Sequence, residues 1–316
     1  MQFNILKKNK FLAAISIFLL VLIVLNTSFF PNYFYFLKSK ILIPIVKFQN
    51  QRNSQELKNC FKNSLSQEST DLKKNILIVG HAYGNSEEKN LGIYPKLIEY
   101  FNEKKHFFDL IVVAGDLVRV PSKNNYDLAI NQLKKFGKDI LIAPGNHDVG
   151  YSFSNEKREI FNNYFGQFYD FRIYKDNLIL ALDTNINSTI DKQQFNWLKN
   201  IVEKNDNINN IMVVTHQIPW RKEVENKILL DKHKKWELVK DRNNELIDFT
   251  NVVDFIKSKQ KNTYFFAGSV NHKNYLYCFK KNNISFINTG VGVNKINSIV
   301  LLKIEKNKVK LFNELF

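Results

Sequence analysis

The sequence predicts an α/β domain in which two packed, mixed β-sheets are flanked by helices, preceded by one membrane-spanning helix. Three observations predict this arrangement. An uncharged run lies near the amino terminus, short apolar runs alternate with helix-like segments from about residue 73 onward, and the last apolar runs leave no room for helices between them. Strands that alternate with helices are typical of parallel sheets, and closely spaced strands are typical of antiparallel hairpins.

The amino terminus predicts a membrane anchor. Residues 1–10 form a short segment with three lysines, and the run Phe11–Phe30 follows without a charge. A helix of about twenty residues, rising about 1.5 Å per residue, crosses the ~30 Å hydrocarbon core of a bilayer. A cleaved signal peptide and a buried core helix are the alternatives. The length of the run and the absence of a small-x-small cleavage site or a polar stripe favour an uncleaved anchor at residues 11–30.

Residues 31–72 are expected to be a juxtamembrane segment and linker. Aromatic residues lie beside lysines in the first part of this segment, a pattern typical of the membrane interface. Three lysines precede the anchor and three follow it, so the positive-inside rule barely decides the orientation. We therefore expect a single-pass membrane protein, with the extracytoplasmic side favoured for the large domain.

From residue 73 to residue 316 the pattern predicts one large domain. Near-continuous apolar runs end in glycine and a polar loop at Asn75–Gly80, Asp109–Gly115 and Asp139–Gly145. Apolar residues recur every three or four positions at Gly92–Lys104 and Tyr126–Phe136, which predicts helices between these strands. The expected remaining strands are at Asn177–Asn185, Asn210–His216 and Asn262–Ser269, followed by closing antiparallel hairpins at 274–279, 284–290 and 298–305.

The charge and the cysteines restrict the partners only weakly. The formal net charge of +16 favours anionic partners, such as a phosphorylated substrate or an acidic membrane surface. The lysines are scattered among many Asn, Ile and Phe residues, as in a proteome-wide bias, so nucleic acid is not an expected partner. Cys60 and Cys278 match neither a zinc knuckle nor a disulfide framework. A bridge between them would form only outside the cytoplasm, and we expect two unrelated thiols.

Polar side chains follow the predicted strands at the point where each strand ends. Asp116 follows the second strand, Asn146, His147 and Asp148 follow the third, and His216 follows a later one. Ligands bind outside the carboxyl ends of strands in open α/β sheets, so these loops are expected to converge. Carboxylate, amide and imidazole groups are ligands of divalent transition metals. Taken singly, the same residues would serve as a turn, a helix cap and a core histidine.

These segments resemble a known family. The sequences GDLV at 115–118, GNHD at 145–148 and THQIP at 215–219 resemble the second, third and fourth motifs of calcineurin-like metallophosphoesterases. ALDTN at 181–185 and QQFNWL at 193–198 resemble a further stretch that holds no metal ligands. The resemblance covers residues 75–293 and implies a four-layer αββα fold.

The resemblance also implies a mechanism. Asp116 would bridge two metal ions, and Asn146 and His216 would hold the second ion. His147 would stabilise or protonate the leaving oxygen, with Asp148 orienting it. The family implies divalent cations, Mn, Fe or Zn, at one or two per chain, and attack on phosphorus by a metal-bound hydroxide.

The first motif departs from the family pattern D-x-H. This chain has GHAYG at 80–84. In one register His81 replaces the aspartate and Tyr83 replaces the histidine; in the other, His81 keeps the histidine position and Val79 replaces the aspartate. His81 lies at the open end of its strand, so we expect it to face the same site as Asp116 and to bind a metal or the substrate phosphate.

The last motif departs from G-H-x-H. Ser269 and Asn271 occupy the two histidine positions, and His272 lies one residue beyond. Adjacent strand residues point to opposite faces, so His272 replaces a lost ligand only where the loop bulges. The first ion is therefore expected to bind more weakly than the second.

Three functions follow from these observations. The first is a membrane-anchored, metal-dependent phosphoesterase that hydrolyses a mono- or diester, with an envelope- or lipid-linked phosphate as substrate. The second is a degenerate relative that binds a phosphorylated ligand or a partner without turnover, suggested by the altered first and last motifs. The third is a nuclease or nucleic-acid binder, which rests on the net charge and on the occasional use of the resembled fold in such enzymes.

Overall fold

The computed structural model describes residues 57, 59–61, 75–84, 91–153, 155–220, 246–269, 276–291, 297–305 and 308–315. The chain divides into two compact units, residues 1–55 and 56–316, and all described residues belong to the second. The expected anchor at 11–30 lies outside the described residues and stays a prediction. The expected domain bounds also stay a prediction. Among the described residues, no helix has the length and apolar character needed to cross a bilayer.

The first sheet has five strands in the order β11-β10-β1-β2-β3. Its parallel part consists of β1 (Asn75–Val79), β2 (Leu110–Ala114) and β3 (Asp139–Ala143). Two antiparallel strands, β10 (Ser298–Glu305) and β11 (Lys308–Leu315), extend it beyond β1. The three strands predicted first from the sequence are therefore confirmed as neighbours with parallel alignment.

The second sheet has six strands in the order β4-β5-β6-β7-β9-β8. Four of them run parallel: β5 (Asn177–Ala181), β6 (Asn210–Thr215), β7 (Asn262–Ala267) and β9 (Ile284–Asn288). Antiparallel strands form the two edges, β4 (Asp170–Tyr174) and β8 (Tyr277–Lys281). The expected closing hairpins are present, but they belong to different sheets, because β8–β9 completes this sheet and β10–β11 completes the first.

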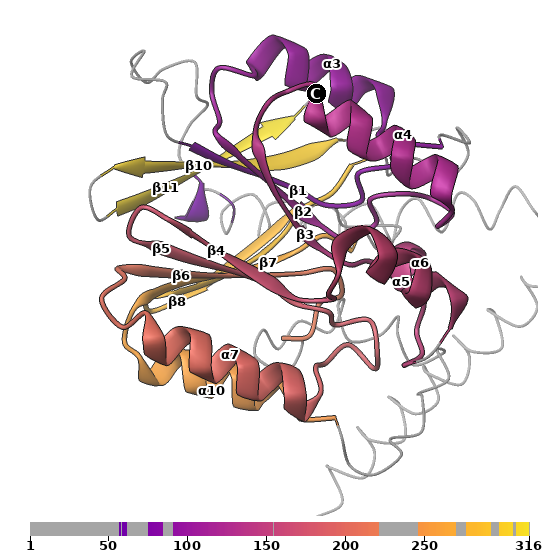
Figure 1. Ribbon diagram of the computed structural model, residues 1–316. Coiled ribbons are helices and arrows are strands. Elements are labelled where there is room, and N and C mark those ends of the chain that lie inside the picture. Colours follow the sequence, from indigo (N-terminus) through magenta and orange to yellow (C-terminus); the bar gives the residue numbers. More distant parts are fainter. Residues whose placement is uncertain are drawn as a thin grey trace, which may run out of the picture. The chain divides into compact units, whose positions relative to one another are not determined.

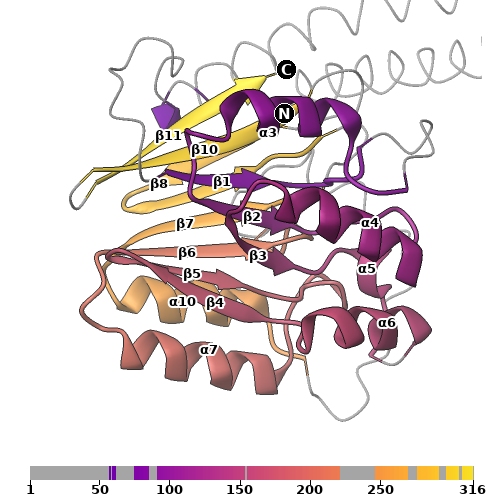
Figure 2. The ribbon, with the colours of Figure 1, turned by 45° about the horizontal axis from the view of Figure 1, so that its top comes forward.

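Helices cover the outer face of each sheet, as Figures 1 and 2 show. Helices α3 (Pro95–Lys104) and α4 (Lys123–Lys134) pack on the first sheet, and α7 (Lys192–Lys204) and α10 (Phe249–Ser258) pack on the second. The short α5 (Asn146–Val149) and α6 (Glu156–Phe165) follow β3. Side chains from both sheets form one buried apolar layer between them. The four-layer α/β architecture predicted from the sequence is confirmed for this unit.

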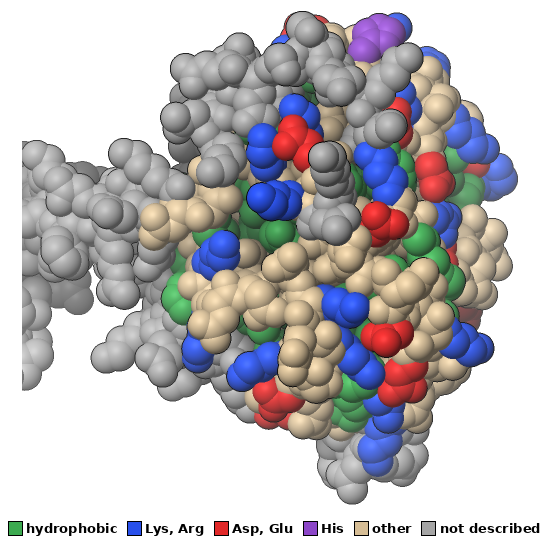
Figure 3. All heavy atoms as spheres, turned by 90° about the vertical axis from the view of Figure 1, so that its left-hand side faces the viewer, with side chains coloured by type: hydrophobic (Ala, Val, Ile, Leu, Met, Phe, Trp, Pro, Cys, Tyr) green, Lys and Arg blue, Asp and Glu red, His purple; other side chains and the backbone are tan. Residues whose placement is uncertain are grey.

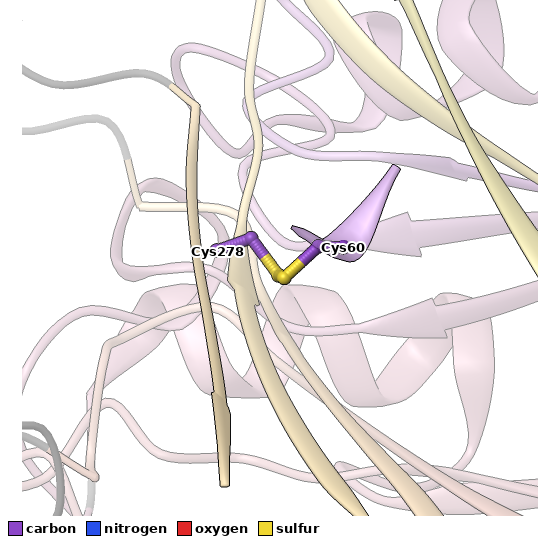
Figure 4. The surroundings of a disulfide bond; sticks show 2 residues. All are labelled: Cys60 and Cys278. Atoms are coloured by element: carbon purple, nitrogen blue, oxygen red, sulfur yellow. A yellow bond between two sulfur atoms is a disulfide. The ribbon is translucent and has the colours of Figure 1, made fainter. Parts of the chain in front are cut away.

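A disulfide joins Cys60 to Cys278, with sulfur atoms 2.04 Å apart. Figure 4 shows Cys60, which precedes the first sheet, bonded to Cys278 on β8. Cys278 is fully buried, and Leu57 and Phe61 pack with Cys60 against the layer between the sheets. The expectation of two unrelated thiols is wrong, because the fold brings two positions 218 residues apart within bonding distance.

Charges are interspersed on the face of the molecule seen in Figure 3. Lysine and arginine side chains lie between acidic ones there, and the described atoms of this face form no continuous basic surface. Such a surface would be the footprint of a nucleic-acid binder. This face therefore fits the interpretation of the +16 charge as scattered lysines.

Candidate active site

Four strands deliver polar residues to one edge of the molecule. His81 follows β1, Asp116 follows β2, Asn146 begins α5 after β3, and His216 follows β6 in the second sheet. The first three strands are parallel neighbours, so their carboxyl ends lie together. His216 reaches the same place because the two sheets pack face to face through the layer that contains Ala114 and Val214.

Glycine allows these loops to approach one another closely. A Cβ on Gly115 would clash with the ring of His216, and a Cβ on Gly145 would clash with Asp116. Asp116 and His81 themselves have positive φ angles of 57° and 55°. Non-glycine residues seldom adopt this left-handed conformation, and it concentrates at functional sites. The strained backbone conformation at Asp116 and His81 thus directs these two side chains into the site.

Acceptor atoms meet around Asp116. His216 donates from Nδ1 to the carbonyl of Ala114 at 3.2 Å, so a neutral ring leaves a lone pair on Nε2. That Nε2 lies 2.9 Å from Oδ1 of Asn146 and 3.4 Å from Oδ2 of Asp116. Gln217 donates to the same Asn146 oxygen at 3.0 Å, which fixes the amide with its oxygen toward His216. Three lone pairs therefore face one another.

His81 repeats this arrangement on the other side of Asp116. Its Nδ1 donates to the carbonyl of Val291 at 2.9 Å, which leaves Nε2 facing Oδ2 of Asp116 at 3.8 Å. Metal-binding histidines usually donate their second ring N–H to a backbone carbonyl or carboxylate, as both His81 and His216 do here. We expected His81 to face the same site as Asp116, and the structure places it there.

The donor set fits one divalent cation. Two ligands of one ion, each about 2.1 Å from it, lie about 3.0–3.4 Å apart, which is close to the separations around Asp116. Among the described residues, no group of three or more His, Cys, Asp or Glu side chains is placed to hold a metal ion. The third close donor is instead the amide oxygen of Asn146. A cation at this point would remove the conflict among the facing lone pairs.

Burial disfavours the charged form of both imidazoles. It lowers the pKa of His81 to about 4, against the opposing attraction of Asp116. Burial also lowers the pKa of His216, again against Asp116. Burial alone would raise the pKa of Asp116, but the nearby histidines and the N–H of His147 outweigh it and hold the pKa below its usual value. The site thus favours an ionised carboxylate at Asp116, surrounded by imidazoles whose charged form is disfavoured by burial.

His147 lies beside this cluster and is oriented by a backbone group. Its Nδ1 donates to the carbonyl of Arg119 at 2.8 Å, which leaves Nε2 available to a substrate. Its backbone N–H donates to Oδ1 of Asp116 at 2.9 Å. The family resemblance implied that Asp148 orients His147, but in the structure the Arg119 carbonyl does so.

Asp148 has a different task in the structure. It is fully buried, and it accepts hydrogen bonds from the backbone N–H groups of Gly145 at 2.8 Å, Leu117 at 3.1 Å and Val118 at 3.2 Å. These bonds tie the loop after β2 to the loop after β3. Burial and the neighbouring Asp116 raise the pKa of Asp148 above its usual value. Asp148 therefore holds in place the backbone that carries Asp116 and His147.

Tyr83 and Ser269 lie at the same edge, where the family pattern would place histidines. The ring of Tyr83 is buried, with its centre 4.3 Å from that of His81 and 5.1 Å from that of His147. Burial raises the pKa of Tyr83 well above its usual value, so the phenol stays protonated. Ser269 donates its backbone N–H to the carbonyl of His216 at 2.8 Å. The other two predicted positions, Asn271 and His272, lie outside the described residues.

The sequence-based prediction missed three residues of this site. Gln217 fixes the amide of Asn146, Tyr151 is hydrogen-bonded to Gln217, and the carbonyl of Arg119 orients His147. Each lies within three residues of a predicted ligand or of the GNHD segment. Proximity to those segments was the available signal, but proximity does not tell which way a side chain points.

Comparisons with known proteins identify relatives in sequence and in fold. A sequence model of the family "Calcineurin-like phosphoesterase" matches residues 79–256, which is more than half of the chain. Among curated proteins, 3',5'-cyclic adenosine monophosphate phosphodiesterase CpdA of Haemophilus influenzae is 27% identical over 73 residues, covering 22% of this chain and 27% of that relative.

Among solved structures, purple acid phosphatase PPD1 from seeds of yellow lupin (Lupinus luteus) is similar, with a TM-score of 0.50. Its identity to this chain is 10%, and the likeness covers 76% of this chain and 53% of the lupin chain. At that identity the likeness shows the fold alone. The chain thus spans about half of the lupin enzyme, and its match covers about a quarter of the Haemophilus relative.

Proposed function

The chain belongs to the calcineurin-like phosphoesterase family, and on that premise we propose that it is a membrane-anchored hydrolase of phosphate esters that depends on a divalent cation. The meeting of lone pairs from Asp116, Asn146 and His216 carries the proposal. Asp116, Asn146 and His216 would hold the cation, and His81, which faces Asp116 from the other side at 3.8 Å, would be a more distant fourth ligand. When bound there, it would neutralise the phosphate and make a water molecule more acidic.

The chain's own residues would position and protonate the substrate. With Nδ1 held by the Arg119 carbonyl, His147 has one fixed tautomer and presents Nε2 outward. A protonated Nε2 would donate to the leaving oxygen as the ester bond breaks. The hydrogen bonds that Asp148 accepts keep the two loops from moving apart during this step.

The proposal places the domain on the extracytoplasmic side of the membrane. The bridge between Cys60 and Cys278 supports that side, since disulfides persist in oxidising compartments and are rare in the cytosol. The uncharged run at 11–30 supports an anchor. A phosphate carried by a lipid or by the cell envelope would be within reach of a domain tethered there.

An activity assay of the full-length protein, solubilised in detergent, tests the proposal. The substrates are p-nitrophenyl phosphate and bis-p-nitrophenyl phosphate, because the Haemophilus relative is named a phosphodiesterase and a diester therefore belongs in the assay. We expect hydrolysis with added Mn²⁺ and its loss after treatment with a chelator. Hydrolysis that is unchanged by the chelator would contradict the dependence on a cation.

A second function is favoured by the altered motifs. In the register that aligns the final glycine of the first motif, Tyr83 is a protonated phenol where the family has a histidine. Ser269 takes another histidine position. A site with these losses would bind a phosphorylated ligand without turnover. Binding of inorganic phosphate by a chain that hydrolyses neither ester would favour this function over the first.

A further inference from the structure

Arg119 lies next to the residue that we expect to protonate the leaving group. It is three positions after Asp116, on the loop that Asp148 holds through the N–H groups of Leu117 and Val118. Its own carbonyl accepts the hydrogen bond from Nδ1 of His147 at 2.8 Å. Val118 before it is buried and Val120 after it is 55% exposed, so Arg119 lies where the loop leaves the protein interior.

No acidic side chain among the described residues pairs with the guanidinium of Arg119. Within the described part of the chain it makes neither an ion pair nor a hydrogen bond, although the residue is half-buried. Its charge acts on the phenol of Tyr83, whose ring lies against His147 and His81. Partial burial of a cation costs hydration free energy, and only pairing with an anion offsets that cost. An anionic ligand bound beside Arg119 would provide this pairing.

Neither nearby acid is available to Arg119. Asp116 faces His81 and His216, and Asp148 is occupied by three backbone N–H groups. The net charge of the site is also compatible with a role for the Arg119 guanidinium in binding the substrate. One divalent cation and the Asp116 carboxylate together carry a single positive charge, which balances a phosphate diester. A monoester, with a second pKa of about 6, carries nearly two negative charges at neutral pH and requires one more cation.

We propose that Arg119 binds the phosphate group of the substrate and makes the site prefer dianionic monoesters over diesters. This inference rests on the proposed function and narrows its substrate class. The planar guanidinium would donate two parallel hydrogen bonds to phosphate oxygens that take no part in the reaction. It would supply positive charge in place of a second metal ion, for which the altered first and last motifs leave few ligands.

Inorganic phosphate and the two nitrophenyl esters test the inference in the full-length protein. Calorimetry with inorganic phosphate should show Arg119→Ala binding about 10- to 100-fold more weakly than wild type, the usual effect of losing a charged hydrogen bond. In the same variant kcat/KM should fall by a similar factor for the monoester and by less than about threefold for the diester. Phosphate binding and monoester turnover of Arg119→Lys should lie between those of wild type and Arg119→Ala. Lysine keeps the charge but cannot donate two parallel hydrogen bonds from a planar group.

Arg172→Ala is the matched control. It removes the same charge from β4, where Arg172 pairs with Asp170 at 2.7 Å and with Asp139 at 3.2 Å, and it should leave phosphate binding and both esters unchanged. Equal losses on monoester and diester in Arg119→Ala, or phosphate binding equal to wild type, would overturn the inference. So would a wild-type protein that binds no phosphate at millimolar concentration.

These outcomes separate the inference from the proposed function. Wild-type turnover with an unaffected Arg119→Ala variant would contradict the role of Arg119 and keep the phosphoesterase. Phosphate binding that depends on Arg119, without turnover of either ester, would keep the role of Arg119 as a phosphate ligand and contradict the enzyme. Thermal melting of each variant confirms that a loss of binding is not a loss of fold.

Discussion

Reduction of the Cys60–Cys278 bridge should destabilise the domain strongly. The bond closes a loop over a sequence separation of 218 residues, and the chain-entropy relation assigns about 5 kcal/mol to a loop of that size. Both cysteines lie against the apolar layer between the sheets, so the folded state keeps its contacts when the bond is reduced. The loss therefore arises from the greater freedom of the unfolded chain.

Thermal unfolding of the oxidised and reduced wild-type chain measures this loss. A domain of this size loses about 2–4 °C of melting temperature per kcal/mol, so we expect reduction to lower the melting temperature by roughly 10–20 °C. The Cys60→Ala/Cys278→Ala double variant should melt near the reduced protein and should not respond to reductant. A wild-type protein that melts at one temperature with and without reductant would refute the reasoning, as would free thiols in the protein isolated from membranes.

Further predictions concern the site, the interior and the anchor. Asp116→Asn should abolish turnover and lower the bound metal while the melting temperature stays within a few degrees of wild type; unchanged turnover would contradict the cation site. His147→Ala should keep its metal and lose on the order of 10²–10⁴ in rate, and loss of metal together with rate would mean that His147 is a ligand. Arg158→Ala breaks a buried ion pair of 2.7 Å with Asp183, so it should cost about 3–5 kcal/mol in urea unfolding, whereas the half-exposed Arg172→Ala should cost less than about 1 kcal/mol; similar costs for both would contradict the burial argument. Deletion of residues 1–30 should release the protein from the membrane pellet, and a truncated protein that still pellets would show a second attachment.

Local sequence patterns were sufficient to predict those strands that are buried on both faces. The strands β1, β2, β5 and β6 appear as near-continuous apolar runs because both of their faces are covered. The edge strand β4, with the sequence DFRIY, is mostly half-buried and mixes charges with apolar residues, so no such run reveals it. The pairing of β10 with β1 joins segments more than 200 residues apart, and no local pattern encodes it.

The candidate site was predictable only to the level of strand ends. Asp116, Asn146 and His216 could be located because polar residues that follow buried strands meet at one edge of a parallel sheet. The hydrogen bonds of Asp148 and the carbonyl of Arg119 could not be located, since they depend on how two loops pack. The disulfide was missed for a similar reason. Only the apolar surroundings of Cys278 hinted at burial, and they said nothing of Cys60.

Titration of Mn²⁺ into the chelator-treated, full-length protein tests the central claim most directly. The lone pairs of Asp116, Asn146 and His216 meet at one point, and the altered first and last motifs leave a second ion few donors. We therefore predict one tight binding event per chain, with a second event that is weak or absent, and loss of the tight event in Asp116→Asn. No binding at all, or two ions bound with equal affinity, would contradict the account.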